Sequence, residues 1–101
     1  MVFTEGPKVE LKRRYVESVR KEIVAFANAE GGVLYLGVED DGEVCGLDDP
    51  QMVEGQVNSV IHDAIAPDLS MFAEARVEQV EDVGIVVVEV QRGPDRPYYL
   101  K

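Results

Sequence analysis

The spacing of apolar residues within positions 21–47 predicts a helix followed directly by a strand. Apolar side chains in residues 23–27 recur at the spacing of one helix face, and Gly31-Gly32 ends this pattern where a left-handed C-cap is favoured. Residues 33–38 are nearly all apolar, which is typical of a strand covered on both faces. We therefore expect this strand to lie in the centre of a sheet.

An acidic turn follows the predicted central strand. Asp41-Gly42 is a strong hairpin signal, because a type I′ turn needs a positive φ at both central residues and these residue types tolerate it. Residues 43–45 would then form a short return strand beside the central one.

The rest of the chain supplies a second helix and further strands. Arg13-Arg14 lead into the first helix, whose apolar stripe begins at Tyr15 or Val16, and Asp48-Asp49-Pro50 is typical of a capped helix start. Pro67 ends this second helix. Extended segments are expected at residues 9–12, 71–78, 85–90 and 98–100. The predicted order is β-α-β-β-α-β-β, an α+β fold with two helices packed on one mixed β-sheet.

Length and composition indicate a single domain at 1–101. No apolar run approaches the ~18 residues that a membrane helix needs, and residues 1–5 lack the features of a signal peptide. Cys45 is the one cysteine, so neither an internal disulfide nor a cysteine-rich zinc site is expected. These features favour the cytoplasm and no membrane partner.

The charge is unevenly distributed. The net charge is −10, which opposes general nucleic-acid binding, but residues 1–21 carry a local +3 and the remainder −13. A basic edge on an acidic body can contact phosphate while the body repels it at long range. The alternative is that these basic residues only solvate a strand edge and one helix face.

Three ordered segments carry a resemblance to a known family. FANAEGGVLYLGVEDDGEVCGL, at residues 26–47, resembles the signature of the Schlafen-AlbA-like domain, also described as the divergent AAA-4 or transcriptional-regulator domain. Residues 5–12 are similar to its "ExxxxEFK" segment, and residues 96–99 to its "RPYY" segment. The resemblance implies a non-catalytic, DNA-binding regulatory module. It also implies that the chain is the N-terminal domain of a longer protein, with further domains after Lys101.

The basic residues are the first candidates for a binding site. Lysine and arginine contacts to phosphate suit weak, backbone-led binding of nucleic acid. The candidates are Lys8, Lys12, Arg13, Arg14, Arg20 and Arg96. For Arg96 the alternative is that it only holds the proline loop in place.

A second hypothesis, implied by the resemblance, is a metal-dependent endoribonuclease. Some Schlafen relatives use three carboxylates, and Glu5 and Glu10 match the spacing of the first two. Asp40 is the best third candidate, with Glu39 or Asp41 as alternatives, and clustered carboxylates suit Mg²⁺ or Mn²⁺. We expect instead that the three do not converge and that Lys12 or Arg13 neutralises Glu10.

No cofactor is expected. The two glycines follow a helix and precede a strand, whereas a phosphate-binding loop follows a strand and precedes a helix. A third hypothesis is a protein-interaction or oligomerisation domain, in which a neighbouring copy of the chain fills an open sheet edge.

Overall fold

Four strands form a mixed sheet in the computed structural model, which describes residues 3–101. β1 (Val9–Lys12) and β2 (Gly32–Leu36) are parallel, whereas β5 (Val83–Val90) is antiparallel to β2 and to β4 (Ala73–Val80). The strand order is β1-β2-β5-β4. β2 and β5 are therefore central, as their nearly continuous apolar sequences predict.

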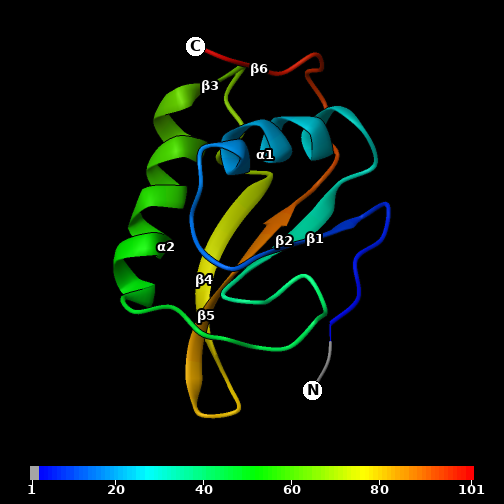
Figure 1. Cartoon of the computed structure of the whole chain (residues 1–101). Helices are drawn as coiled ribbons and strands as arrows, with labels where there is room; N and C mark the ends of the chain where they lie inside the picture. Colours follow the sequence, from blue (N-terminus) through cyan, green and yellow to red (C-terminus); the bar gives the residue numbers. More distant parts are fainter. Residues whose placement is uncertain (1–2) are drawn as a thin grey trace.

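Both helices pack on one face of this sheet (Figure 1). α1 is Ser18–Asn28, and α2 (Pro50–Ser59) continues as a π-helical turn, η1 (Val60–Ala64). The α+β fold with two helices on a mixed sheet is thus confirmed. The core between helices and sheet includes Val19, Ile23, Ala27, Leu34, Leu36, Val53, Val57, Ile61, Val86 and Val88, all buried.

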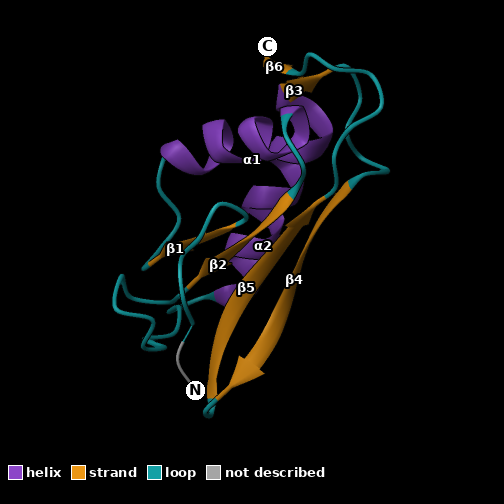
Figure 2. Cartoon of the chain, turned by 90° about the vertical axis from the view of Figure 1, so that its right-hand side faces the viewer, coloured by secondary structure: helices purple, strands orange, loops and turns teal. Residues whose placement is uncertain are grey.

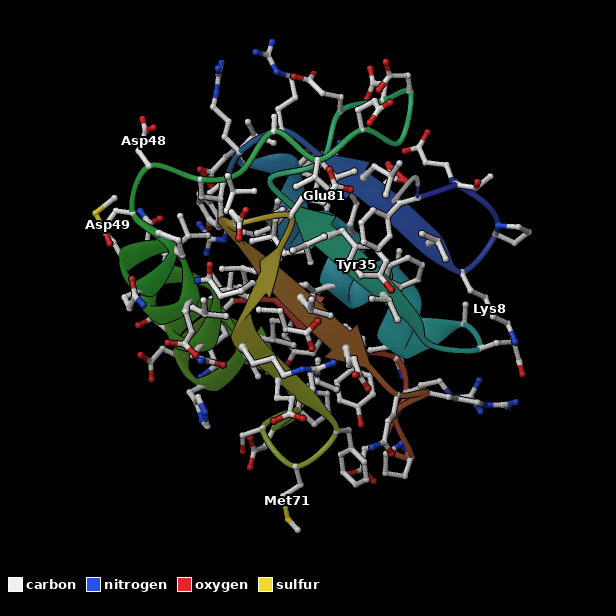
Figure 3. All side chains as sticks on the ribbon, turned by 90° about the horizontal axis from the view of Figure 1, so that it is seen from below. Lys8, Tyr35, Asp48, Asp49, Met71 and Glu81 are labelled. Atoms are coloured by element: carbon white, nitrogen blue, oxygen red, sulfur yellow. The ribbon has the colours of Figure 1, made fainter. Side chains whose placement is uncertain are left out.

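The opposite face of the sheet holds a smaller apolar cluster, formed by Leu11, Val38, Ile85 and Val87. The N-terminal segment and the loop after β2 cover it: the Phe3 ring lies 4.5 Å from the Tyr35 ring, and Val44 packs beside them. Figure 3 shows Tyr35 on this face of β2. Burial on both faces explains why the sequence of β2 does not alternate.

The C-terminal segment folds back onto α1. β3 (Ile65–Ala66) pairs with β6 (Tyr99–Leu100), and this short ladder lies beside α1 at the end of the molecule away from the β4–β5 turn (Figure 2). Asn28, at the end of α1, accepts a hydrogen bond from Tyr98 N at 2.7 Å and donates one to Tyr98 O at 3.0 Å. Tyr98 is consequently buried, with 2% of its surface exposed.

The predicted type I′ turn at Asp41-Gly42 is wrong in its detail. Gly42 N donates to Glu39 O at 2.9 Å and Glu39 N to Glu43 O at 2.8 Å, so three residues form the loop and only Gly42 has a positive φ, of 91°. The predicted return strand at 43–45 is reduced to a single bridge between Val38 and Val44. The reason is Gly37, whose φ of 105° bends the chain so that its carbonyl accepts from two later amides.

Other predicted boundaries are shifted as well, among them the end of β4 and the start of β5, which lie at Val80 and Val83 instead of residues 78 and 85. α1 begins at Ser18, so Tyr15 and Val16, where the apolar stripe was expected to begin, lie in the loop before the helix. β4 begins at Ala73 instead of residue 71, because Phe72 N bonds to Leu69 O in a turn. No helix in residues 3–101 has the length and apolar composition to cross a membrane.

A two-residue turn with both φ values positive connects β4 to β5 instead. Glu81 and Asp82 have φ values of 51° and 67°, between the paired residues Val80 and Val83. This is the type I′ pattern, and it occurs here without glycine.

Replacing Asp82 with glycine is expected to stabilise the protein. Glycine adopts a positive φ without steric cost, so Asp82→Gly should raise the free energy of unfolding by about 0.5–1 kcal/mol. Urea unfolding measures this. Asp41→Gly is the matched control: Asp41 has no positive φ and its carboxylate accepts from Glu43 N at 3.0 Å, so this substitution should destabilise. Equal effects at both positions would contradict the assignment.

Both edges of the four-stranded sheet have side chains bonded to their outer backbone. On β1, Gly6 and Val9 exchange backbone hydrogen bonds, and Glu5 Oε2 accepts from Leu11 N at 3.3 Å. On β4, the Asn58 amide of α2 donates to Ala75 O at 3.3 Å and accepts from Ala75 N at 3.2 Å. Glu5, a candidate metal ligand from the sequence, thus contributes to the edge of the sheet.

Candidate nucleic-acid interface

The Arg13-Arg14 pair lies in the loop between β1 and α1, and both residues are exposed. Arg13 Nε is 3.1 Å from Glu39 Oε1, although 66% of the Arg13 side chain remains exposed. Within residues 3–101, Arg14 forms no ion pair. Arg14 therefore keeps its guanidinium donors available for an external anion.

Three shallow hollows surround this pair, and Arg14 lines all of them. One of about 240 Å³ lies between the pair and residues 45–48, and one of about 200 Å³ also includes Lys12 and Asp40. The largest of the three, about 310 Å³, lies against the first turns of α2. The loop thus presents two adjacent arginines on a surface that contains shallow hollows.

The other predicted basic residues are dispersed. Lys12 and Arg20 are held by glutamates at 3.0 Å and 3.1 Å. Lys8 and Arg96 are exposed, but neither lines the hollows around the arginine pair. Figure 3 shows Lys8 far from Asp48, which lines two of these hollows. Of the predicted basic residues, the structure therefore brings together Arg13 and Arg14. Lys12 lines one hollow beside them, but its ammonium group is paired with Glu22.

A lysine lies between two glutamates where β1 meets α1. Lys12 Nζ is 3.0 Å from Glu22 Oε2 and 3.8 Å from Glu10 Oε1. Each of these side chains is only about a quarter to a third exposed. Lys12, and not Arg13, is thus the cation that contacts Glu10.

Of the three carboxylates suggested for a metal site, Glu5 and Glu10 lie near enough for the charge of Glu5 to raise the pKa of Glu10, whereas Asp40 lies beside the arginine pair. Glu5 bonds to the β1 backbone, Glu10 faces Lys12, and Asp40 lines the hollow beside Arg13 and Arg14. Among residues 3–101, no group of three or more His, Cys, Asp or Glu side chains is arranged to hold a metal ion. Glu22 of α1 interacts with both Glu10 and Lys12, although its helical spacing is that of a solvent-facing residue.

Glu22 shifts the acid–base properties of its neighbours. Partial burial raises the pKa of Glu10, and the charges of Glu22 and Glu5 raise it further against the opposing effect of Lys12. Burial alone would lower the pKa of Lys12, but the hydrogen bond and charge of Glu22, with the charges of Glu10 and Glu5, raise it overall. Lys12 therefore stays protonated and binds its two carboxylates.

Glu10 is expected to make the protein less stable as the pH rises. The pKa of Glu10 is higher in the folded than in the unfolded protein. Its contribution to the free energy of unfolding is therefore fully present below the ordinary glutamate pKa and is lost as the pH rises through the raised value. Glu10→Gln should therefore be more stable than wild type at neutral pH and lack this dependence. Thermal unfolding across the acidic range measures it.

Carbon-detected NMR titration of the Glu10 carboxyl gives an independent check. In Glu22→Gln, the pKa of Glu10 should return towards its ordinary value, because one of the raising charges is removed. A Glu10 carboxyl that titrates at its ordinary value in wild type would contradict this account.

Cys45 also borders the arginine loop. Its thiol lies 3.9 Å from the Arg13 carbonyl oxygen, and burial followed by the charge of Glu39 raises the pKa of the thiol. A raised pKa lowers the fraction of thiolate, so this exposed cysteine is a weak nucleophile.

Three polar residues with specific partners were not identified from the sequence. Glu22 bonds to Lys12, Asn28 to the backbone of Tyr98, and Asn58 to the backbone of Ala75. Glu22 has the spacing of a solvent-facing residue, and an asparagine at a helix end is also favoured as a cap. The one available signal for Asn28 was its place in the FANAEGG part of the stretch at residues 26–47 that resembles the family signature.

The family described as Schlafen, AlbA_2 matches residues 5–101 of the chain. The N-terminal domain of a protein from Nitrosomonas europaea, described as related to the ATP-dependent DNA helicase RecG, is similar in structure. The TM-score is 0.78 at 31% identity, and the match covers 98% of this chain and 73% of that chain. The DIP2311 protein from Corynebacterium diphtheriae has a TM-score of 0.63 at 16% identity, over 90% of this chain and 19% of that chain, which shows the fold alone.

Proposed function

Because the chain belongs to the Schlafen, AlbA_2 family, we propose that it is a cytoplasmic, DNA-binding regulatory domain without catalytic activity. It contacts the phosphate backbone through the Arg13-Arg14 loop. The observation that carries the proposal is that Arg14, exposed and without an ion pair in residues 3–101, lies beside a second arginine on a hollowed surface. The similarity to a domain of a RecG-related protein supports an association with nucleic acid.

The charge distribution sets the strength of this binding. The net charge of −10 repels a polyanion at long range, while the arginine loop attracts phosphate at short range. Each neutralised phosphate makes the slope of log affinity against log salt concentration more negative by about 0.9. Two arginine contacts therefore give weak binding with a slope of about −2.

Fluorescence anisotropy with a labelled oligonucleotide tests the proposal. Raising the salt concentration fourfold should weaken binding about tenfold, as expected for two phosphate contacts. Affinity independent of salt, or no binding at low salt, would overturn it. A protein-interaction or oligomerisation domain would then become the better hypothesis.

We also propose that no metal or nucleotide is required. The ammonium group of Lys12, 3.0 Å from Glu22 and 3.8 Å from Glu10, supports this because it supplies the positive charge that a cation would otherwise bring. The test is incubation with labelled RNA and DNA in the presence of Mg²⁺ or Mn²⁺, and the substrates should stay intact. Cleavage that Glu10→Gln abolishes would favour the endoribonuclease hypothesis instead.

A further inference from the structure

The hollow between the arginine loop and α2 differs from the other two beside Arg14. Its volume is about 310 Å³, and apolar groups from Tyr15, Leu47 and Met52 contribute to its lining. Tyr15 and Leu47 are partly buried against the main core, whereas 56% of Met52 is exposed. The hollow thus has an apolar floor, formed by side chains that pack against the core, and an exposed thioether at its border.

Polar groups of opposite character border this floor. Arg14 supplies a guanidinium, Gln56 an exposed amide, and Asp48 an exposed carboxylate. No hydrogen bond or ion pair within residues 3–101 occupies the Asp48 carboxylate. Asp48 and Asp49 both line this hollow and would repel a phosphate, so a neutral group fits it. An anionic group fits the neighbouring hollow of about 200 Å³, where Lys12, Arg13 and Arg14 outnumber the one carboxylate, Asp40.

A nucleobase meets these requirements. It is neutral, flat and apolar on its faces, and it stacks on aromatic side chains. Its edge carries hydrogen-bonding groups, and an exocyclic amino group, as in cytosine or adenine, donates to a carboxylate. A base can enter only when it is unstacked from its neighbours, which costs least in a single strand.

We propose that this hollow binds one unstacked base of a single-stranded nucleic acid, with the adjacent phosphate on Arg13 and Arg14. The inference rests on the proposed function and goes beyond it in two respects. It assigns a preference for single strands over duplex, and a preference for cytosine or adenine over thymine or uracil through Asp48.

Anisotropy measurements with labelled oligo-dC, oligo-dT and a duplex of equal length test both preferences. Oligo-dC should bind more tightly than either of the others. Met52→Ala should weaken oligo-dC binding by roughly tenfold, the effect of losing an apolar packing partner, and leave duplex binding unchanged. Met71→Ala is the matched control, because Met71 is 84% exposed and lies on the opposite side of the molecule from Asp48 and Asp49 (Figure 3).

Asp48→Asn tests the base preference. Asparagine both donates and accepts, so the variant should bind oligo-dC and oligo-dT about equally. Asp82→Asn, at the exposed β4–β5 turn, removes the same charge and should keep the preference of wild type.

The outcomes separate the two proposals. If reversing the Arg13 and Arg14 charges abolishes binding while Met52→Ala has no effect, the inference is overturned and phosphate binding stands. Equal affinity of wild type for single strands and duplex also overturns it. If charge reversal at the arginine pair has no effect, the proposed function fails and the inference fails with it.

Discussion

Replacing Arg13 and Arg14 together with glutamate is expected to abolish detectable binding to DNA and RNA. The two substitutions change the charge of residues 1–21 from +3 to −1, so the one basic region of an acidic chain becomes repulsive. Arg14 has no ion pair in residues 3–101 to lose, and Arg13 contacts Glu39 with its side chain 66% exposed. The fold should therefore be preserved, because exposed ion pairs contribute only about 0–1 kcal/mol.

The matched control is Arg92→Glu with Lys101→Glu. These residues are exposed and line none of the hollows beside Arg14, and their replacement changes the net charge by the same amount. This control should weaken binding only slightly, through the long-range field. If the Arg13 and Arg14 variant binds as well as wild type, the basic segment is only a solvated surface. Circular dichroism of each variant verifies that the fold is intact.

Asn28→Ala is expected to lower the free energy of unfolding by about 2–4 kcal/mol, because each buried backbone group left without a partner costs about 1–3 kcal/mol. The Asn28 amide satisfies both backbone groups of Tyr98, at 2.7 Å and 3.0 Å, and these residues are 70 positions apart in the chain. Alanine removes both bonds, and water has little access because Tyr98 is 2% exposed.

Asn58→Ala provides the matched comparison in chemical denaturation. Asn58 makes the same pair of bonds to Ala75, but they are longer, at 3.3 Å and 3.2 Å. Its loss should cost less than the loss of Asn28. A larger effect at Asn58 would mean that the Asn28–Tyr98 contact contributes little to stability.

Local patterns in the sequence predicted the elements of the fold but not their long-range polar contacts. Residues 33–38 were recognisable as a central strand because burial on both faces requires a continuous apolar run. The turn at Asp41-Gly42 was misassigned because the dipeptide also fits a three-residue loop, in which only Gly42 needs a positive φ. Conversely, Glu81 and Asp82 adopt the type I′ pattern without its usual glycine.

The candidate sites show the same division. Arg13 and Arg14 were predicted as a pair because they are adjacent in the sequence, and the loop keeps them on one surface. Glu22 could not be predicted as the partner of Lys12. Helical spacing indicates on which face of the helix a residue lies, but it does not indicate which strand packs against that face. Arg96 and Lys8, basic and exposed, line none of the hollows beside the pair, because the chain directions at those points depend on tertiary packing.

The side chains bonded to the outer backbone of β1 and β4 have a consequence for self-association. An open strand edge acts as a template on which another chain adds a strand, which leads to fibres and swapped dimers. Glu5 occupies the Leu11 amide on one edge, and Asn58 occupies both backbone groups of Ala75 on the other. A second copy would have to displace these bonds before it could extend the sheet. We therefore expect assembly through these two edges to be disfavoured, and Glu5→Ala with Asn58→Ala to make the protein prone to aggregate through them.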